Sequence, residues 1–253
     1  MDKKLIESGC LTKFLGYGKL NGEYWFIGME EGGAEIENWS KIGTIKLEES
    51  LRLRAKFKRY MDFVEVWEKK YGIPLKEYRG NTVWRYISAF LLCLEKKSVV
   101  KERPSSKEIK KFLFDDDPKM GRTDGNHFVC ELFPLPNRKS NKLEDEYKSV
   151  WSNREEYEDE VRKPRLDIIW RNIEGNPNLK FVIIYGKRIR EIFKCYLENL
   201  YSNKFKNIKL GNPHFELREI TGKSFKILFT PFFGRGLSYD AIKDIVNQLR
   251  TLK

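Results

Sequence analysis

The chain has 253 residues and a formal net charge of +12, from 49 basic and 37 acidic side chains, with an isoelectric point near 9.4. Such a charge favours a polyanionic partner, and nucleic acid is the best candidate. The sequence contains no run of eighteen apolar residues and no signal peptide, so we expect neither a membrane protein nor a secreted one. We expect a monomer in the cytoplasm, associated with the nucleoid.

The four cysteines are far apart in the sequence and form no CxxC pair: Cys10, Cys93, Cys130 and Cys195. Structural zinc sites need closely spaced cysteine or histidine ligands, and a disulfide framework belongs to small secreted proteins. The sequence therefore predicts reduced, mostly buried thiols, no metal and no cofactor.

The first informative stretch is a strand that ends in two carboxylates. Residues 24–27 are aromatic and β-branched, which predicts a buried strand. Glu30 and Glu31 follow between Gly28 and the Gly32–Gly33 pair. Because open α/β sheets bind ligands at the carboxyl ends of their parallel strands, we expect both carboxylates to lie at a functional site.

Two helices and a polar insertion are expected next. Residues 47–71 show helical spacing of apolar residues against a basic face that includes Arg52, Arg54 and Lys56. That face is either solvated or in contact with phosphate groups. Residues 82–94 predict a core helix, and 96–126 a polar insertion whose aspartates lack the spacing of a calcium loop.

The second half of the chain supplies the remaining strands. Residues 127–133 predict a strand that breaks at two prolines, and 179–187 a buried parallel strand followed by a helix. Residues 142–163 form a second charged insertion, and Pro164 is expected to begin the next helix. The last strand covers 225–229, with a closing helix after it. Together these elements predict a single α/β domain over 1–253, three-layer α/β/α around a mostly parallel four-stranded sheet.

Four short motifs follow these strands in order, and they resemble motifs of the uracil-DNA glycosylase superfamily. They are Gly-Met-Glu-Glu-Gly-Gly at 28–33, Glu-Leu-Phe-Pro-Leu-Pro-Asn-Arg at 131–138, Gly-Lys at 186–187 and Thr-Pro-Phe at 230–232. The first lacks the usual proline and the last lacks the usual histidine. The resemblance implies the fold of that superfamily and a monofunctional DNA glycosylase, which flips a base out of DNA and hydrolyses its N-glycosidic bond.

The resemblance also implies roles for individual residues. Glu30, or else Glu31, would stabilise the sugar cation and orient the attacking water. Trp39 either lines the base pocket or is a packing residue. Leu237 would enter the gap left by the flipped nucleotide, although a packed leucine in a glycine turn looks similar. The implied base-binding residues are Gly28, Met29, Trp39, Glu131, Phe133 and Thr230, and the implied DNA-binding residues are Arg138, Lys187, Arg188, Arg235 and Leu237.

Glu131 occupies the position where the superfamily has an asparagine that contacts uracil. An asparagine amide both donates and accepts hydrogen bonds, whereas an ionised glutamate only accepts, and cytosine presents an amino donor. The substitution favours a modified cytosine-type base, as in defence against phage, although Glu131 is equally a structural ion-pair residue. Repair of uracil or another deaminated base is an alternative, as is a non-catalytic DNA-binding module on the same fold. A nucleotide-processing enzyme is less favoured, because no phosphate-binding loop is present.

Overall fold

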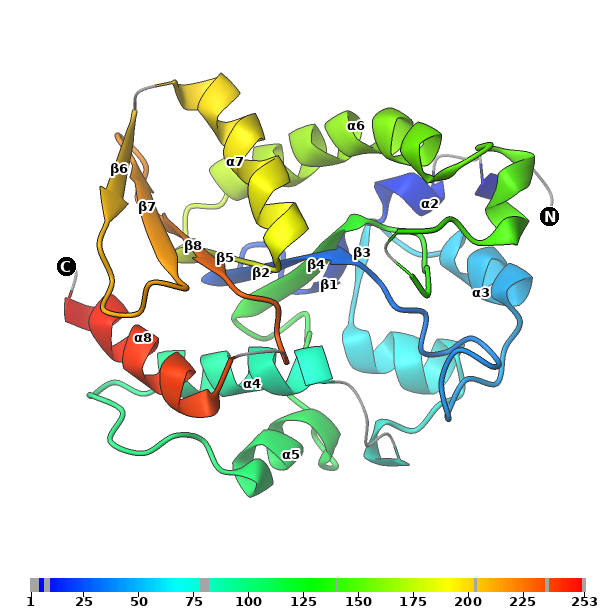
Figure 1. Cartoon of the computed structure of the whole chain (residues 1–253). Coiled ribbons are helices and arrows are strands. Elements are labelled where there is room, and N and C mark those ends of the chain that lie inside the picture. Colours follow the sequence, from blue (N-terminus) through cyan, green and yellow to red (C-terminus); the bar gives the residue numbers. More distant parts are fainter. Residues whose placement is uncertain are drawn as a thin grey trace. The chain divides into compact units, whose positions relative to one another are not determined.

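The computed structural model describes residues 5–6, 10–77, 82–139, 141–202, 204–234 and 237–251. The chain divides into two compact units, the first formed by Met1–Pro74 with Gly121–Leu179 and the second by Leu75–Met120 with Lys180–Lys253. Each unit therefore combines two separate stretches of chain, as the colours in Figure 1 show. The single domain expected over 1–253 stays a prediction.

The first unit contains four strands among its described residues. They are β1 (Gly16–Gly18), β2 (Tyr24–Glu30), β3 (Tyr60–Met61) and β4 (His127–Phe133). Strands β2 and β4 run parallel, and β1 pairs antiparallel with β4 and parallel with β3. The strands predicted at 24–27 and 127–133 are thus confirmed. Trp25, Phe26 and Ile27 are wholly buried, as expected for a strand without an exposed face.

Strand β1 approaches β4 so closely that glycine is required. A Cβ atom on Gly16 would lie 2.1 Å from the main-chain oxygen of Val129, and one on Gly18 would lie 2.4 Å from that of His127. Both glycines also have positive φ angles, 151° and 105°. Since glycine alone fits this approach, the glycine-rich segment before β2 is an inner part of the unit.

The helices of the first unit differ from expectation at 47–71. They are α2 (Cys10–Lys13), α3 (Leu47–Arg54), the π-helix η1 (Glu65–Lys70), the 3-10 helix η3 (Asp145–Ser149) and α6 (Arg154–Glu174). The single helix expected over 47–71 is wrong, because the chain leaves α3 to add β3 to the sheet. Asp62 then starts the next helix, since its carboxylate accepts from the main-chain N–H groups of Val64 and Glu65.

Helix α6 also begins earlier than expected. Asn153 is its N-cap, and its side chain accepts from the main-chain N–H of Glu156 at 3.0 Å. Pro164 therefore lies inside the helix and does not begin it. The interior proline costs the helix one main-chain hydrogen bond.

A buried arginine joins α6 to other parts of the same unit. Arg165 is 2% exposed, and its guanidinium donates to the main-chain oxygens of Thr12, Phe14, Glu131 and Leu132 at 2.7–3.1 Å. Burial lowers the pKa of Arg165. Four carbonyl dipoles in place of a carboxylate thus surround this cation, and they tie the N-terminal segment and β4 to the helix.

The second unit contains the other four strands of the described residues. They are β5 (Phe181–Tyr185), β6 (Phe205–Ile208), β7 (Glu216–Ile220) and β8 (Lys226–Thr230). Strand β5 pairs parallel with β8, β8 antiparallel with β7, and β7 antiparallel with β6. The helices are η2 (Leu75–Glu77), α4 (Thr82–Leu94), α5 (Ser106–Phe114), α7 (Lys187–Tyr201) and α8 (Tyr239–Thr251). The helix expected at 82–94 is confirmed.

The α/β class is confirmed, and the sheet prediction requires correction. Eight strands occur in the described residues where four were expected, and antiparallel pairs occur in both units. The added strands are short or lie in segments with weak apolar alternation, such as β3 with two residues and β1 with three. The parallel pairs β2–β4 and β5–β8 are the strands that the apolar runs predict.

Candidate functional site

Glu30 and Glu31 lie where the sequence predicts them, at the carboxyl end of a parallel strand. Glu30 is the last residue of β2 and is level with Phe133, the last residue of β4. The main-chain oxygen of Glu31 accepts from the main-chain N–H of Asn137 at 2.9 Å. This hydrogen bond brings the loop after β2 and the proline-containing loop after β4 together.

Glu31 is held by one of its two carboxylate oxygens. Its Oε2 accepts from Arg54 Nη2 at 2.6 Å and from the Tyr17 hydroxyl at 3.4 Å. Its Oε1 has no hydrogen-bond donor among the described residues, and the side chain is 18% exposed. Glu31 is therefore a carboxylate fixed through Oε2, and no described residue occupies its Oε1.

Arg54 is in turn held by hydrogen bonds to two further side chains. Its Nη2 also donates to Glu35 Oε1 at 2.8 Å, its Nε donates to Ser50 Oγ at 3.2 Å, and Ser50 donates to Glu35 at 2.7 Å. The Arg54 side chain is 3% exposed, so the interpretation that it belongs to an exposed basic face is wrong. Burial acts to lower the pKa of Arg54, but the neighbouring carboxylates and tyrosines raise it above its ordinary value, so the group stays charged.

Glu30 is held by both carboxylate oxygens. Arg154 Nη1 donates to Oε1 at 2.6 Å, and Asn137 Nδ2 donates to Oε2 at 3.2 Å. Arg154 also donates through Nε to Glu158 at 2.6 Å. Burial raises the pKa of Glu30 to about 7, although Arg154 and Asn137 act to lower it. Near neutral pH Glu30 is therefore close to its own titration midpoint.

We call these side chains the carboxylate–arginine cluster. It consists of Glu30, Glu31, Glu35, Glu158, Arg54, Arg154 and Arg162, the last of which pairs with Glu158 at 3.3 Å and is 37% exposed. Four carboxylates thus share three arginines. Glu31 and Glu35 share the single Arg54, so this part of the cluster carries one more negative than positive charge when all three are ionised.

Trp39 and Arg138 lie together beside the loop of residues 28–33. A Cβ atom on Gly33 would lie 2.6 Å from the Trp39 ring, so the half-buried indole packs directly on this glycine. Arg138 is exposed, its guanidinium lies 5.3 Å from the centre of the Trp39 ring, and it pairs with Glu144 at 3.0 Å. The indole therefore both packs on the loop and presents a partly exposed surface.

The other implied base-binding residues of this unit differ in burial. Phe133 is wholly buried, with the Arg154 guanidinium 5.0 Å from its ring centre, which makes it a packing residue. Glu131 is half-buried and level with the buried Gly28, while Met29 is half-buried. Residues that pair across parallel strands point to the same side, so Glu131 shares the face of Glu30.

In the second unit, Thr230 and Lys187 lie at the carboxyl ends of β8 and β5. Thr230 is wholly buried, and its hydroxyl donates to the main-chain oxygen of Pro231 at 2.8 Å. That hydroxyl therefore already has an acceptor. Lys187 and Arg188 are exposed at the start of α7, directly after Gly186. Arg235 lies outside the described residues.

Leu237 requires a correction, because it is packed, whereas Phe232 of the same loop is exposed. Leu237 is 6% exposed, and its main-chain oxygen accepts from the Tyr86 hydroxyl at 2.6 Å, so it is packed and cannot project into DNA. Phe232, from the same loop, is 49% exposed and lies beside Gly186. Its neighbour Phe233 is buried, which the sequence pattern gave no means of predicting.

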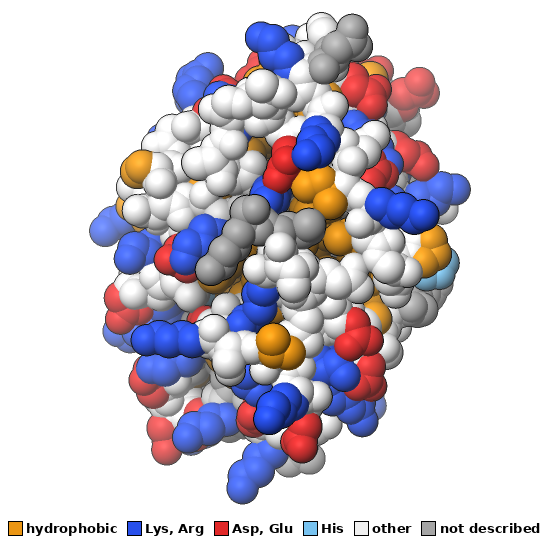
Figure 2. Space-filling view, turned by 90° about the vertical axis from the view of Figure 1, so that its left-hand side faces the viewer, with side chains coloured by type: hydrophobic (Ala, Val, Ile, Leu, Met, Phe, Trp, Pro, Cys, Tyr) orange, Lys and Arg blue, Asp and Glu red, His pale blue; other side chains and the backbone are white. Residues whose placement is uncertain are grey.

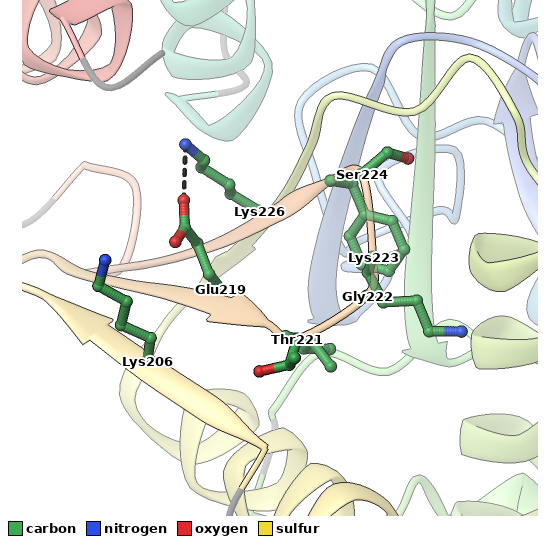
Figure 3. Close-up of a pocket in the computed structure, with 9 residues that line it drawn as sticks. Lys206, Glu219, Thr221, Gly222, Lys223, Ser224 and Lys226 are labelled. Atoms are coloured by element: carbon green, nitrogen blue, oxygen red, sulfur yellow. Dashed lines mark ion pairs between the residues drawn. The ribbon is translucent and has the colours of Figure 1, made fainter.

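A cavity of about 290 Å³ lies elsewhere in the second unit, along β6, β7 and β8. Lys206, Glu219 and Lys226 are paired residues on these three strands, and Figure 3 shows their side chains on one side of the strands. Lys226 pairs with Glu219 at 2.7 Å. This row stabilises the sheet, and lysine on β6 also discourages pairing with another chain.

The positive charge is not confined to one area of the surface. On the face drawn in Figure 2, lysine and arginine side chains are spread over the surface with acidic side chains between them. Within the described residues, no helix is long and apolar enough to cross a membrane, and no three or more His, Cys, Asp or Glu side chains are grouped to hold a metal ion. Of the described thiols, Cys93 and Cys130 are buried and Cys195 is exposed.

Comparison with known proteins adds no relative. No protein-family model matches the chain, and no curated protein sequence matches it.

Proposed function

We propose that this chain is a monofunctional, metal-independent DNA glycosylase that excises a non-standard pyrimidine. The observation that carries the proposal is Glu31, a carboxylate fixed at the carboxyl end of β2 by buried Arg54 while its Oε1 accepts no hydrogen bond from a described residue. The resemblance of four strand-end motifs to the uracil-DNA glycosylase superfamily supports it, and we propose the fold of that superfamily as well.

The chemistry requires a negative charge next to the sugar. Cleavage of an N-glycosidic bond leaves positive charge on the deoxyribose, and a carboxylate held in place stabilises that charge without reorganising. Glu31 Oε1 would face the sugar and orient the attacking water, while the ion pair at Oε2 fixes its direction. The uncompensated negative charge of the carboxylate–arginine cluster adds to the same effect.

The hydrogen bonds of the two candidate carboxylates differ. Both oxygens of Glu30 accept hydrogen bonds, from Arg154 and Asn137, whereas only Oε2 of Glu31 accepts one from a described residue. We therefore propose Glu31 as the catalytic carboxylate and Glu30 as the group that holds Arg154. Sequence alone had favoured Glu30.

We further propose that the base is a modified cytosine and that excision serves defence against phage. Glu131, on the same face as Glu30, accepts hydrogen bonds when ionised and so suits an exocyclic amino group. Uracil or another deaminated base, excised in repair, is the alternative. Exposed Lys187 and Arg188 would contact phosphate groups, and the Phe232 ring would stack on a base.

Base release from defined duplexes tests the proposal. The protein is incubated with duplexes that carry uracil, other deaminated bases or bulky modified cytosines, and abasic sites are then cleaved and counted. We expect product from a modified-cytosine duplex, and Glu31→Gln should lower the rate by about a hundredfold or more.

Two further variants serve as controls. Glu35→Gln removes a carboxylate from the same Arg54 but leaves Glu31, and Glu30→Gln removes the other candidate, so both should lose less activity than Glu31→Gln. Absence of abasic product from every duplex, or an unchanged rate in Glu31→Gln, contradicts the proposal.

A non-catalytic DNA-binding module is the second candidate. The observation that favours it is that both candidate carboxylates are in arginine ion pairs, which is also what a purely structural network looks like. This candidate requires salt-sensitive binding to duplex DNA without release of any base.

A further inference from the structure

A second cavity, of about 550 Å³, lies between the segment that leads into α5 and the first turn of α8. One wall consists of residues 101–106 and the other of residues 239–243, and both walls belong to the second unit. Cavities of about 300–1,000 Å³ are typical of small-molecule sites. The first wall is part of the polar insertion, which has no role in the proposed function.

Hydrogen bonds within the unit fix both walls. Asn247 on α8 accepts from the main-chain N–H of Val100 at 2.8 Å and donates to the main-chain oxygen of Val100 at 3.0 Å. Ser105 and Glu108 form a capping box at the start of α5. The chain before and after residues 101–104 is therefore held in place, so the cavity is formed before any ligand binds.

Cationic side chains line both walls, with a carboxylate between them. Lys101 and Arg103 lie on the first wall, and Lys243 and Asp240 on the second. Arg103 Nε is 3.7 Å from Asp240 Oδ2, and Lys243 Nζ is 3.8 Å from Oδ1. Both distances exceed those of N–H···O hydrogen bonds, so Asp240 attracts these cations while its oxygens can still accept hydrogen bonds from a ligand.

Tyr239 adds an aromatic ring to the second wall. The residue is half-buried and lines the cavity, and its ring centre is 5.0 Å from that of Tyr86. Tyr86 is itself held, since its hydroxyl donates to the main-chain oxygen of Leu237 at 2.6 Å. The packing against Tyr86 therefore holds the Tyr239 ring in place at the cavity.

We propose that this cavity binds a ribonucleoside monophosphate. Lys101, Arg103 and Lys243 bind the phosphate group, because cations that donate several hydrogen bonds suit its oxygens. Asp240 accepts from the ribose hydroxyl groups, as acidic residues do in many nucleotide sites. The base stacks on Tyr239, an interaction that any base can make. This site is separate from the carboxylate–arginine cluster and goes beyond the proposed function.

Isothermal titration calorimetry of the full-length protein tests the site. The probes are the common ribonucleoside 5′-monophosphates, their 2′-deoxy forms, the free nucleosides and inorganic phosphate. We expect at least one ribonucleoside monophosphate to bind. Its nucleoside, inorganic phosphate and its 2′-deoxy form should each bind at least about tenfold more weakly, because each lacks one of the three recognised groups.

Two aspartate variants test the contact with the ribose. Asp240→Ala should remove the difference in affinity between the ribose and 2′-deoxyribose forms. Asp244→Ala is the matched control, because Asp244 lies on the same helix, has a similar exposure (60% against 56%) and is 3.4 Å from the same Lys243, but does not line the cavity. It should leave that difference unchanged.

Two further variants test the contact with the phosphate. Arg103→Gln should weaken binding of the monophosphate by about tenfold and leave that of the nucleoside unchanged. Arg103 is 58% exposed, so the variant should fold. Lys110→Gln removes an exposed cation of α5 that does not line the cavity, and it should bind the monophosphate as the unaltered protein does.

Several results would overturn the site. They are no binding of any ribonucleoside monophosphate, inorganic phosphate that binds as tightly as the nucleotide, and a ribose preference that persists in Asp240→Ala or is lost equally in Asp244→Ala. Unchanged affinity in Arg103→Gln would place the nucleotide elsewhere and also contradict the site. The calorimetry requires no base release, so failure of the glycosylase proposal leaves this result unaffected.

Discussion

At the scale of single residues, His127 shows how burial sets a protonation state. It begins β4, is 1% exposed, and its Nε2 accepts from the main-chain N–H of Gly121 at 2.8 Å. Burial lowers the pKa of His127 to about 4. The ring is therefore neutral at pH 7, and we assign it a structural role.

This burial predicts sensitivity to acid. Below pH 6.5 the unfolded chain gains a proton at His127 that the folded chain does not gain until about pH 4, so His127 acts to lower the free energy of unfolding across this interval, whereas Glu30, with its pKa raised to about 7, acts to increase it. The contribution of His127 is about 3 kcal/mol, and the difference between the unaltered protein and His127→Gln isolates it. Urea denaturation at several pH values measures it.

The variant His127→Gln should have a smaller loss, because glutamine accepts the same hydrogen bond without titrating. The exposed His214 provides the control, and His214→Gln should show the acid dependence of the unaltered protein. Equal acid dependence in both variants would contradict the assignment.

At the scale of elements, the start of α6 determines where Arg154 lies. Asn153 caps the helix and Arg154 is its first residue. Loss of the cap frees main-chain N–H groups of the first turn, which are otherwise satisfied by the Asn153 side chain. The cap therefore contributes both to stability and to the position of the guanidinium beside Glu30.

We expect Asn153→Ala to lower the free energy of unfolding by about 1 kcal/mol. Asn153→Asp retains an acceptor oxygen and should lose much less. Urea denaturation of the two variants beside the unaltered protein makes the comparison. An equal loss in both would mean that the side-chain cap is not what stabilises the helix start.

The elements also show what the sequence could predict. Continuous apolar runs located β2, β4 and β5, because strands buried on both faces leave a strong pattern. The break after α3 was missed because apolar spacing continues past it, although Asp62 with Glu65 three residues later was a usable cap signal. The two-residue strand β3 has too few residues to produce any pattern.

The site was predictable only in part, because the side chains that hold the two carboxylates are far from them in the sequence. The turn after β2 identified Glu30 and Glu31, but their partners Arg54 and Arg154 lie 23 and 124 residues away. A signal for Arg54 was present, since it shares the buried face of α3 with Leu47 and Leu51. Nothing local marks Arg154, because tertiary packing alone brings it to Glu30.

At the scale of the whole molecule, the net charge of +12 should govern association with DNA. Each phosphate that a cation neutralises releases counterions, so the logarithm of the affinity falls linearly with the logarithm of the salt concentration. Lys187 lies at the carboxyl end of β5, which pairs with β8. Lys206 on β6 is in register, through Glu219 on β7, with Lys226, the first residue of β8. Lys206 therefore lies level with the opposite end of the β5–β8 pair.

We therefore expect Lys187→Ala to reduce the salt slope by about one, and Lys206→Ala to leave it unchanged. Fluorescence anisotropy with a labelled duplex at several salt concentrations measures both. Equal slopes in the two variants would show that the charge acts diffusely, without a defined contact at Lys187.

Arg165 has a consequence for how this sequence can change in evolution. Its four acceptors are main-chain oxygens, which every amino acid possesses. Substitution at Thr12, Phe14, Glu131 or Leu132 leaves these oxygens in place as long as the local path of the chain is kept. As far as Arg165 is concerned, divergent descendants should thus tolerate substitution of the four residues that carry these oxygens while retaining the arginine, and an insertion between 12 and 14 should be rarer than any substitution there.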